Sequence, residues 1–280
     1  MLSDIICSRA ADIPEAQRRN IEATVGCGHE IVVIDNSQGR YSIFQAYNEG
    51  VRRAKGDLLC FMHDDVVFAT DGWGGRIARH FDDPAVGVVG FGGAHFVPDA
   101  PLYWTELPFV SEHCRNDDGH GTLTDCVCTD YFRGGLADVV VVDGFCMVVR
   151  ASLFGQISFD EKTYAGFHAY DMDLCMQVVA LGGRVCVCRD VMPVHTWSEA
   201  MAGRKKGMEL LRPNMRLFQQ KWSHMLPLWR GMELQPQAAR RLDGLCRRAA
   251  DSYAARHSAA YRLGSAVVRP VKRLLGRCGR

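Results

Sequence analysis

The sequence has no long hydrophobic run. No stretch approaches the roughly 18 consecutive apolar residues that a helix needs to cross a bilayer. The first ten residues, MLSDIICSRA, also lack the basic segment followed by an apolar stretch that marks a signal peptide. We therefore expect a cytoplasmic protein that contacts a membrane, if at all, only peripherally from the inner face.

The chain has little net charge, because two regions of opposite charge cancel. The formal charge of the whole chain is +1. The segment 240–280 contains eleven Lys or Arg and two Asp, a net of +9, which leaves −8 for residues 1–239. An acidic body without a recognition motif argues against nucleic-acid binding. The basic tail, with apolar residues spaced among arginines, suits either an anionic membrane surface or a solvated, partly disordered end.

The cysteines lack the spacing of a zinc motif. The chain has twelve cysteines, but the close pairs Cys126/Cys128 and Cys186/Cys188 are separated by one residue, where zinc sites use Cys-x-x-Cys. Many lie in apolar runs such as LLCFM and GFCMVV, which indicates buried free thiols in a reducing compartment. Alternation along a strand explains the second pair at least as well as a metal site.

What the sequence does contain is a regular alternation of strand and helix patterns. Short, continuous apolar runs predict strands buried on both faces at 4–8, 30–34, 57–62 and 86–91. Between them, one helix is predicted from Pro14 to Gly26, and another from the capping-box pair Ser42 and Gln45 to Gly56. This order predicts an α/β protein with a doubly wound, mostly parallel, Rossmann-like sheet.

The second half of the chain is less regular. Residues 98–138 have no clear period and predict a loop-rich insertion. Strand patterns return at 138–150 and 184–188, with helices expected from about 171 to 182 and from 205 to 222. We expect one domain at 1–226, followed at 227–280 by a Pro-containing linker and a basic helical tail.

Polar residues follow three of the predicted strands. Ser8 and Arg9 follow the first strand, Asp35 and Asn36 the second, and His63, Asp64 and Asp65 the third. Because ligands of open parallel sheets bind beyond the carboxyl ends of the strands, these clusters predict a polar pocket at one edge. Turn formation explains Asp35 and Asn36 equally well when they are taken alone.

His63 and Asp65 alternate along an extended backbone, so both side chains can face the same way. An imidazole nitrogen and a carboxylate oxygen there can hold a divalent cation, with diphosphate oxygens in the remaining positions. The alternative is a strand-end histidine capped by its neighbouring aspartates.

Five motifs occur in an order that resembles a known family. They are IVVIDNSQG, AYNEGVRRAKGDLLCFMHDDVVF, VDGFCMVVR, FHAYDMDLCMQVVALGGRV and PVHTW. Together they resemble the family 2 glycosyltransferases of the GT-A fold, and more closely a bacterial branch that carries His-x-Asp in place of Asp-x-Asp. The resemblance covers residues 3–222.

The resemblance implies a donor site at the first three strands. Asp35 would contact the nucleotide base or ribose beside Ser8, Arg9 and Asn36. Asn48, Lys55 and Asp57 match a family stretch near the nucleotide, although helix surface and cap are an equal explanation. The donor-site residues implied in this way are Ser8, Arg9, Asp35, Asn36, Asn48 and Asp64, together with the Asp143-Gly144 turn beside the donor sugar.

The resemblance also implies a metal shell of His63, Asp65 and His195 that bridges the donor diphosphate. Mn²⁺ tolerates imidazole better than Mg²⁺ does, which favours Mn²⁺. A lone His195 would more often be structural. Trp197 could line the sugar or acceptor pocket or belong to the core.

Asp171 is the predicted catalytic base. Tyr170 replaces the Glu of the family's Glu-Asp motif, and Asp171 falls at a helix N-terminus, where the dipole favours the ionised form. Such a carboxylate can remove the proton of an acceptor hydroxyl, a contribution of about 10²- to 10⁴-fold in rate. A simple N-cap is the alternative. Asp173 is expected to be structural or to bind the acceptor.

These observations predict a metal-dependent, inverting glycosyltransferase of the hexosyltransferase type in glycan or polysaccharide assembly. The donor would be a nucleotide sugar, with uridine the safest base, and the acceptor a glycan or lipid-linked hydroxyl. One alternative is a catalytically inactive sugar-nucleotide-binding protein. Another is a non-haem Fe(II) oxygenase that uses His63, Asp65 and His195, with Arg204 near a co-substrate carboxylate.

Overall fold

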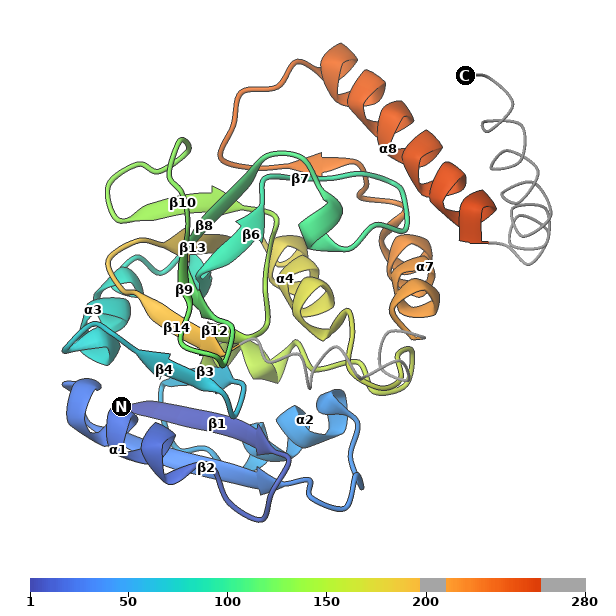
Figure 1. Cartoon of the computed structure of the whole chain (residues 1–280). Coiled ribbons are helices and arrows are strands. Elements are labelled where there is room, and N and C mark those ends of the chain that lie inside the picture. The colour runs from blue at the N-terminus through green and yellow to red at the C-terminus, as the bar shows by residue number, and fades with distance from the viewer. Residues whose placement is uncertain (197–209, 258–280) are drawn as a thin grey trace, which may run out of the picture.

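A computed structural model describes residues 1–196 and 210–257. Its centre is a seven-stranded sheet with the strand order β10-β13-β5-β12-β3-β1-β2 (Figure 1). The strands are β1 (Leu2–Ser8), β2 (His29–Asp35), β3 (Leu58–Met62), β5 (Val86–Gly90), β10 (Leu136–Val139), β12 (Cys146–Arg150) and β13 (Arg184–Cys188).

The predicted mixed α/β architecture with a mostly parallel sheet is confirmed. β1 runs parallel to both β2 and β3, and β13 runs parallel to β5. The exceptions are β12, which lies antiparallel between β3 and β5, and the edge strand β10. Five strands therefore end at the same edge of the sheet.

Helices cover both faces of this sheet, because the central strands are apolar on both sides. Along β3, Phe61 belongs to one core cluster and its neighbour Cys60 to the other, as strand alternation requires. Tyr47 of α2 (Ile43–Arg53) and residues of α4 (Tyr170–Ala180) pack in the first cluster. Ile21 of α1 (Glu15–Thr24) and residues of α3 (Trp73–His80) pack in the second.

The predicted capping box starts α2 at the carboxyl edge of the sheet. The Ser42 hydroxyl accepts a hydrogen bond from the Gln45 backbone N–H, and the Gln45 side chain accepts one from the Ser42 N–H at 3.0 Å. Two backbone N–H groups that have no partner within the helix are hydrogen-bonded in this way. The box fixes where Ser42 and Ile43 lie, and both line the cavity described below.

A second sheet crosses the carboxyl edge of the first. Its order is β11-β6-β8-β14-β4, with β9 paired to β8. Its strands are β4 (Val66–Phe68), β6 (Gly92–Ala94), β8 (Val110–Asp117), β9 (Leu123–Cys128), β11 (Val141–Val142) and β14 (Pro193–Thr196). The short 3₁₀ helices are η1 (Trp104–Glu106) and η2 (Ala151–Gly155).

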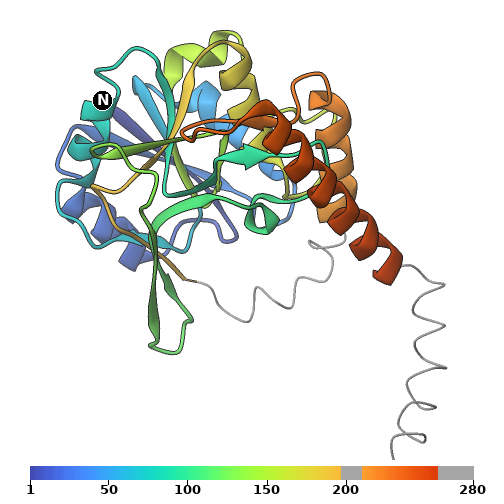
Figure 2. The same cartoon turned by 90° about the horizontal axis from the view of Figure 1, so that it is seen from above.

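The expectation that 98–138 is loop-rich is wrong for much of that segment. β8 and β9 form a regular antiparallel hairpin, which projects from the body in Figure 2. Leu123 and Val127 of β9 are about half exposed. Because this hairpin buries little, its sequence lacks the apolar alternation that identifies a strand.

The C-terminal region packs on the body. α7 spans Leu211–Trp222, and the predicted start of this helix at 205 lies outside the described residues. Within the predicted linker, β15 (Leu228–Trp229) pairs with β7 (Phe96–Val97). α8 (Pro236–His257) buries Ala239, Cys246 and Ala250 in the core.

α8 is also held by polar contacts. Asp243 Oδ1 accepts the Asp99 N–H at 2.7 Å, and the Arg247 guanidinium lies 2.6 Å from Asp99 Oδ2. The part of the basic tail that the structure describes, up to residue 257, is thus part of the fold. Among the described residues, no helix has the length and apolar content needed to cross a membrane.

Candidate functional site

The loops after β1, β2 and β3 meet at the carboxyl edge of the sheet. Ser8 at the end of β1 pairs in register with Asp35 at the end of β2, and the Asn36 N–H donates to Ser8 O at 2.9 Å. His63 follows β3 directly, and its N–H donates to Phe145 O at 2.9 Å. The parallel register therefore brings the three predicted clusters together.

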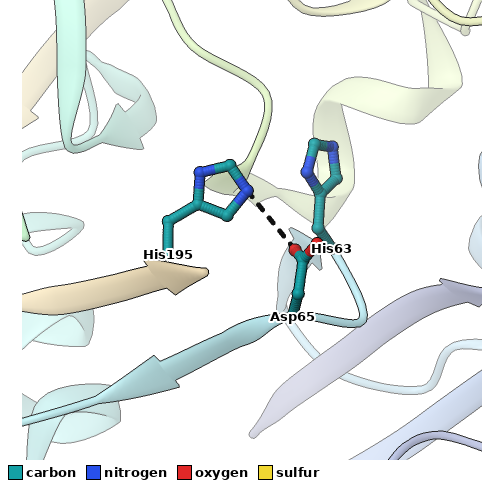
Figure 3. Close-up of side chains that lie close together, drawn as sticks. All are labelled: His63, Asp65 and His195. Atoms are coloured by element: carbon teal, nitrogen blue, oxygen red, sulfur yellow. Dashed lines mark ion pairs between the residues drawn. The ribbon is translucent and has the colours of Figure 1, made fainter. Parts of the chain in front are cut away.

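His63, Asp65 and His195 converge at this edge (Figure 3). One potential ligand atom from each lies within 4.8 Å of the others. β14 carries His195 to the site, since β14 pairs antiparallel with β4 and sets His195 opposite Val66, directly after Asp65. His195 Nε2 lies 3.3 Å from Asp65 Oδ1, and the two imidazole centroids are 5.5 Å apart.

The facing atoms of this cluster fit a cation. Asp65 Oδ1 and His195 Nε2 are both buried, and neither makes a hydrogen bond of regular geometry within the described part of the chain. Their only close partner among the described residues is each other, at 3.3 Å, and a bound cation would give both atoms a ligand bond. Burial raises the pKa of Asp65, but the His195 contact and the charges of His63 and Arg9 outweigh it and lower that pKa overall.

Aromatic residues orient both imidazoles. The Phe145 ring stacks on His195 at 4.9 Å, and the Tyr170 hydroxyl lies 2.9 Å from His63 Nε2. Tyr170 fits only because residue 144 is glycine, since a Cβ there would lie 2.3 Å from the Tyr170 oxygen. Partners of this kind fix the tautomer and orientation of metal-binding histidines. This role of Tyr170 could not be predicted from the sequence, where it stands only as a replacement for the family's Glu.

A cavity of about 260 Å³ opens beside the cluster. Its lining combines the three strand-end loops with the start of α2 and the segment before α4. The lining residues are Cys7, Arg9, Asn36, Tyr41, Ser42, Ile43, His63, Asp64, Asp65, Gly166 and Phe167.

Arg9 and Asp64 form the charged wall of this cavity. The backbone N–H and the Nε of Arg9 donate to Asp64 Oδ2 at 3.0 and 2.9 Å. Arg9 Nη2 also lies 3.2 Å from Asp65 Oδ2. The guanidinium is half exposed and spans both carboxylates, which places a fixed positive charge next to the candidate cation site.

Several predicted donor-site residues use their side chains within the protein. The Ser8 hydroxyl donates to Asp12 O at 2.8 Å, Asp35 Oδ1 accepts the Ser37 N–H at 2.9 Å, and neither residue lines the cavity. The Asn36 side chain bridges to the backbone of Tyr41 at 2.9 and 3.0 Å, while Asn36 itself lines the cavity.

Asn48, Lys55 and Asp57 lie away from the cavity. Asn48 exchanges two hydrogen bonds with the Phe159 backbone at 2.8 and 3.1 Å. Asp57 is exposed and pairs at 2.9 Å with the N-terminal ammonium, at the amino end of β3. Because His63 follows the carboxyl end of the same strand, Asp57 lies at the edge of the sheet opposite the cavity, and its expected place near the nucleotide stays a prediction.

Asp171 lies in the first turn of α4, as predicted, but burial moves its ionisation toward neutral pH. The residue is 1% exposed. Burial, and then the charge of Asp143, raise the pKa of Asp171 to about 7. Its carboxylate accepts the Met172 N–H at 2.8 Å, the Gly144 N–H at 3.1 Å and the Tyr103 hydroxyl at 3.2 Å. Desolvation outweighs the helix dipole here.

Asp143 connects this acid to the cation cluster. Burial raises its pKa, while the nearby His195 charge acts in the opposite direction. Asp143 is only partly buried, and it directly precedes the Gly144 that donates to Asp171. The two carboxylates influence each other's protonation and titrate as a pair.

Asp173 is structural, one of the two roles expected for it. Its buried carboxylate accepts hydrogen bonds from Tyr164 at 3.0 Å, Trp222 Nε1 at 2.8 Å and Lys221 at 3.0 Å. It thereby joins α4 to α7. Trp197 and Arg204 lie outside the described residues.

Residues 5–215 match the model of a glycosyltransferase-like family. A search among curated protein sequences found no match. Among solved structures, GalNAc-T7 with UDP, GalNAc and Mn²⁺ aligns with a TM-score of 0.49 and 11% identity, over 70% of this chain and 44% of that chain. The chain thus spans less than half of that protein.

Two further glycosyltransferases align comparably. The mannosyltransferase PcManGT of Pyrobaculum calidifontis, with GDP-Man and Mn²⁺, has a TM-score of 0.47 and 15% identity over 96% of this chain and 79% of that one. S. aureus TarS 1-349 with UDP-GlcNAc has a TM-score of 0.44 and 14% identity over 70% and 58%. The family model matches about three quarters of the length of the present chain, and the chain therefore belongs to the glycosyltransferase-like family.

Proposed function

We propose that this protein is a cation-dependent transferase that moves a sugar from a nucleotide-sugar donor to an acceptor hydroxyl. The observation that carries the proposal is the convergence of His63, Asp65 and His195 beside the 260 Å³ cavity. Family membership supplies the reaction class, and the paired carboxylates supply a proton acceptor.

The donor diphosphate would lie against the cation cluster and Arg9. One carboxylate and two imidazoles form a shell that suits Mn²⁺ better than Mg²⁺. A divalent cation there would neutralise charge on the departing nucleoside diphosphate. Arg9 would donate hydrogen bonds to the same phosphates, and Asp64 would hold Arg9 in place. Asn36 and Tyr41 also line the cavity, and we assign the base or ribose to them.

Proton removal is assigned to the Asp143–Asp171 pair. A carboxylate with a pKa of about 7 is a stronger base than an ordinary aspartate and is still partly ionised at neutral pH. Asp171 is the buried member of the pair. Asp143 is more exposed and lies close enough to His195 to feel its charge. Removal of the acceptor proton as the oxygen attacks the anomeric carbon gives inversion in a single displacement.

We further propose a uridine-linked hexose donor and a glycan or lipid-linked acceptor, in polysaccharide assembly at the cytoplasmic side of a membrane. The membrane part rests on the basic tail alone. The described helix α8 turns Ala239, Cys246 and Ala250 toward the body, and its exposed arginines would be available to anionic lipid.

A second candidate function uses the same cluster. Two histidines and one carboxylate also form the iron-binding set of non-haem oxygenases. That chemistry normally lies in a double-sheet β barrel, whereas this cluster lies at the edge of a mostly parallel α/β sheet. The family match further favours the transferase.

A thermal-shift screen of nucleotide sugars with and without Mn²⁺ tests the proposal. A ligand at 100 times its Kd stabilises the folded state by about 2.7 kcal/mol. We expect stabilisation by a uridine-linked sugar that depends on Mn²⁺ and disappears in Asp65→Asn. The control is Asp57→Asn, which removes an exposed carboxylate at the opposite edge of the sheet. Stabilisation by Fe²⁺ with 2-oxoglutarate, and not by nucleotide sugars, would overturn the proposal.

Transfer activity separates an enzyme from an inactive binding protein. With the donor found in the screen, Asp171→Asn should retain donor binding and lose transfer by about 10²- to 10⁴-fold. Unchanged transfer in this variant would remove Asp171 from the mechanism. Donor binding without transfer in the unmodified protein, across a panel of acceptors, would support the inactive alternative.

A further inference from the structure

A second group of metal-binding side chains lies at the other end of β14 from His195. His80 is the last residue of α3, Cys188 is the last residue of β13, and Asp190 lies in the loop between β13 and β14. One potential ligand atom from each lies within 4.8 Å of the others. This group shares no residue with the cluster at the cavity.

Two of the three separations in this group are close to the edges of a small coordination tetrahedron, and the third is within 4.8 Å. His80 Nε2 lies 3.6 Å from Cys188 Sγ and 3.0 Å from Asp190 Oδ2. With zinc bond lengths of about 2.3 Å to sulfur and 2.0 Å to nitrogen and oxygen, tetrahedral edges are about 3.5 Å for S–N and 3.3 Å for N–O. Both contacts fall within about 0.3 Å of these edges, so a small ion fits with little movement.

The ligand types distinguish this group from the first. The cavity cluster offers only nitrogen and oxygen, whereas this one adds a thiol, which favours Zn²⁺ over Mn²⁺ or Mg²⁺. His80 is largely buried and Asp190 is partly exposed, so a water molecule can reach the fourth position. We propose that His80, Cys188 and Asp190 form a zinc site separate from the catalytic cation site.

The surrounding backbone is built to hold these side chains. The Asp190 N–H donates to Cys188 Sγ at 3.3 Å, and the Arg189 N–H donates to Gly135 O at 3.0 Å. Gly135 leaves space for the Asp190 carboxylate, since a Cβ there would lie 2.3 Å from Oδ2. The loop thus directs thiol and carboxylate to the same side, toward the end of α3.

Zinc at this position would stabilise the strand pair β4–β14, which positions Asp65 and His195 of the first cluster. β4 follows Asp65, β14 carries His195, and the two strands pair antiparallel. Beyond this pairing, the Ala69 N–H donates to Met192 O at 3.0 Å. A cation held by His80, Cys188 and Asp190 would link α3, which follows β4, to the loop that precedes β14. The role is structural and does not depend on the transferase proposal.

Cobalt substitution of the purified full-length protein tests the site. After chelator treatment, we expect Co²⁺ to produce a thiolate-to-metal charge-transfer band, for which His63, Asp65 and His195 supply no thiol. The band should disappear in Cys188→Ala and persist in Cys186→Ala, a matched control two residues earlier in the same strand, where the thiol is equally buried. A band that survives in Cys188→Ala, or no band in the unmodified protein, overturns the proposal.

Zinc affinity gives a second measurement that does not depend on a buried substitution. Asp190→Asn changes one partly exposed atom and should retain the fold. We expect zinc affinity, measured by competition with a chromophoric chelator, to fall about tenfold or more in Asp190→Asn and in His80→Gln. It should be unchanged in Asp57→Asn, which removes an exposed carboxylate that belongs to neither cluster. Equal affinity in all of these variants would place the zinc elsewhere.

Discussion

Asp4 is a buried acid whose ionisation should control stability between pH 5 and 7. It lies in the middle of β1, between Ile31 of β2 and Cys60 of β3, and is 0% exposed. Neither carboxylate oxygen makes a hydrogen bond within the described residues. Burial, only partly offset by the Cys60 thiol, raises the pKa of Asp4 to about 8.

The sign and size of the effect follow from proton linkage. In the unfolded chain an aspartate has a pKa of about 3.9, so between pH 5 and 7 it is ionised, while the folded state keeps Asp4 protonated. The folded state therefore binds one more proton, and the free energy of unfolding falls by about 1.4 kcal/mol for each pH unit. From pH 5 to pH 7 the Asp4 contribution to stability falls by about 3 kcal/mol.

Asp4→Asn removes this dependence while keeping the size of the side chain. We expect the free energy of unfolding of the variant, relative to the unmodified protein, to rise by about 3 kcal/mol between pH 5 and pH 7, measured by urea denaturation. Asp143 and Asp171 add pH dependence to both proteins, so their contribution cancels in the difference.

Asp57→Asn is the matched control for this experiment. Asp57 is 89% exposed, and the N-terminal ammonium lowers its pKa, so it is ionised in both states above pH 5. Its difference curve should be flat. A flat curve for Asp4→Asn as well would refute the argument that burial keeps Asp4 neutral.

Three further predictions concern the site. Tyr170→Phe removes the hydroxyl 2.9 Å from His63 Nε2 and should weaken Mn²⁺ binding by about 10- to 100-fold in calorimetry; an unchanged affinity would contradict the orienting role. Gly144→Ala places a Cβ 2.3 Å from the Tyr170 oxygen and should cost about 1–3 kcal/mol in urea denaturation. Asp143→Asn removes a charge that raises the pKa of Asp171, so the pH of half-maximal transfer should fall; a profile that stays in place would separate the two acids.

The sequence was sufficient for the sheet and for part of the cation cluster. Apolar runs located β1, β2, β3 and β5 because strands buried on both faces need no polar residues. The spacing of His63 and Asp65 after β3 indicated two side chains that could hold one cation, but the expected extended backbone is wrong, because Asp64 and Asp65 form a turn between β3 and β4. His195 was assigned by resemblance alone, because it reaches Asp65 through the pairing of β14 with β4, which no local pattern encodes.

Other features depend on tertiary contacts that local sequence does not carry. The pKa of Asp171 is set by burial and by Asp143, 28 positions earlier in the chain, whereas local position indicates only a helix start. Nothing in the sequence indicated that Tyr170 fills the space that the missing Gly144 side chain leaves. The β8–β9 hairpin was missed because its exposed strands bury too little to impose an apolar period.

The most direct test of the account is to locate the cation. A crystal of the protein soaked with Mn²⁺ and UDP should show an anomalous difference peak at the manganese edge, within bonding distance of His63, Asp65 and His195 and of the diphosphate. A diphosphate bound in the cavity without such a peak, or a peak at a different group of residues, would contradict the proposed site.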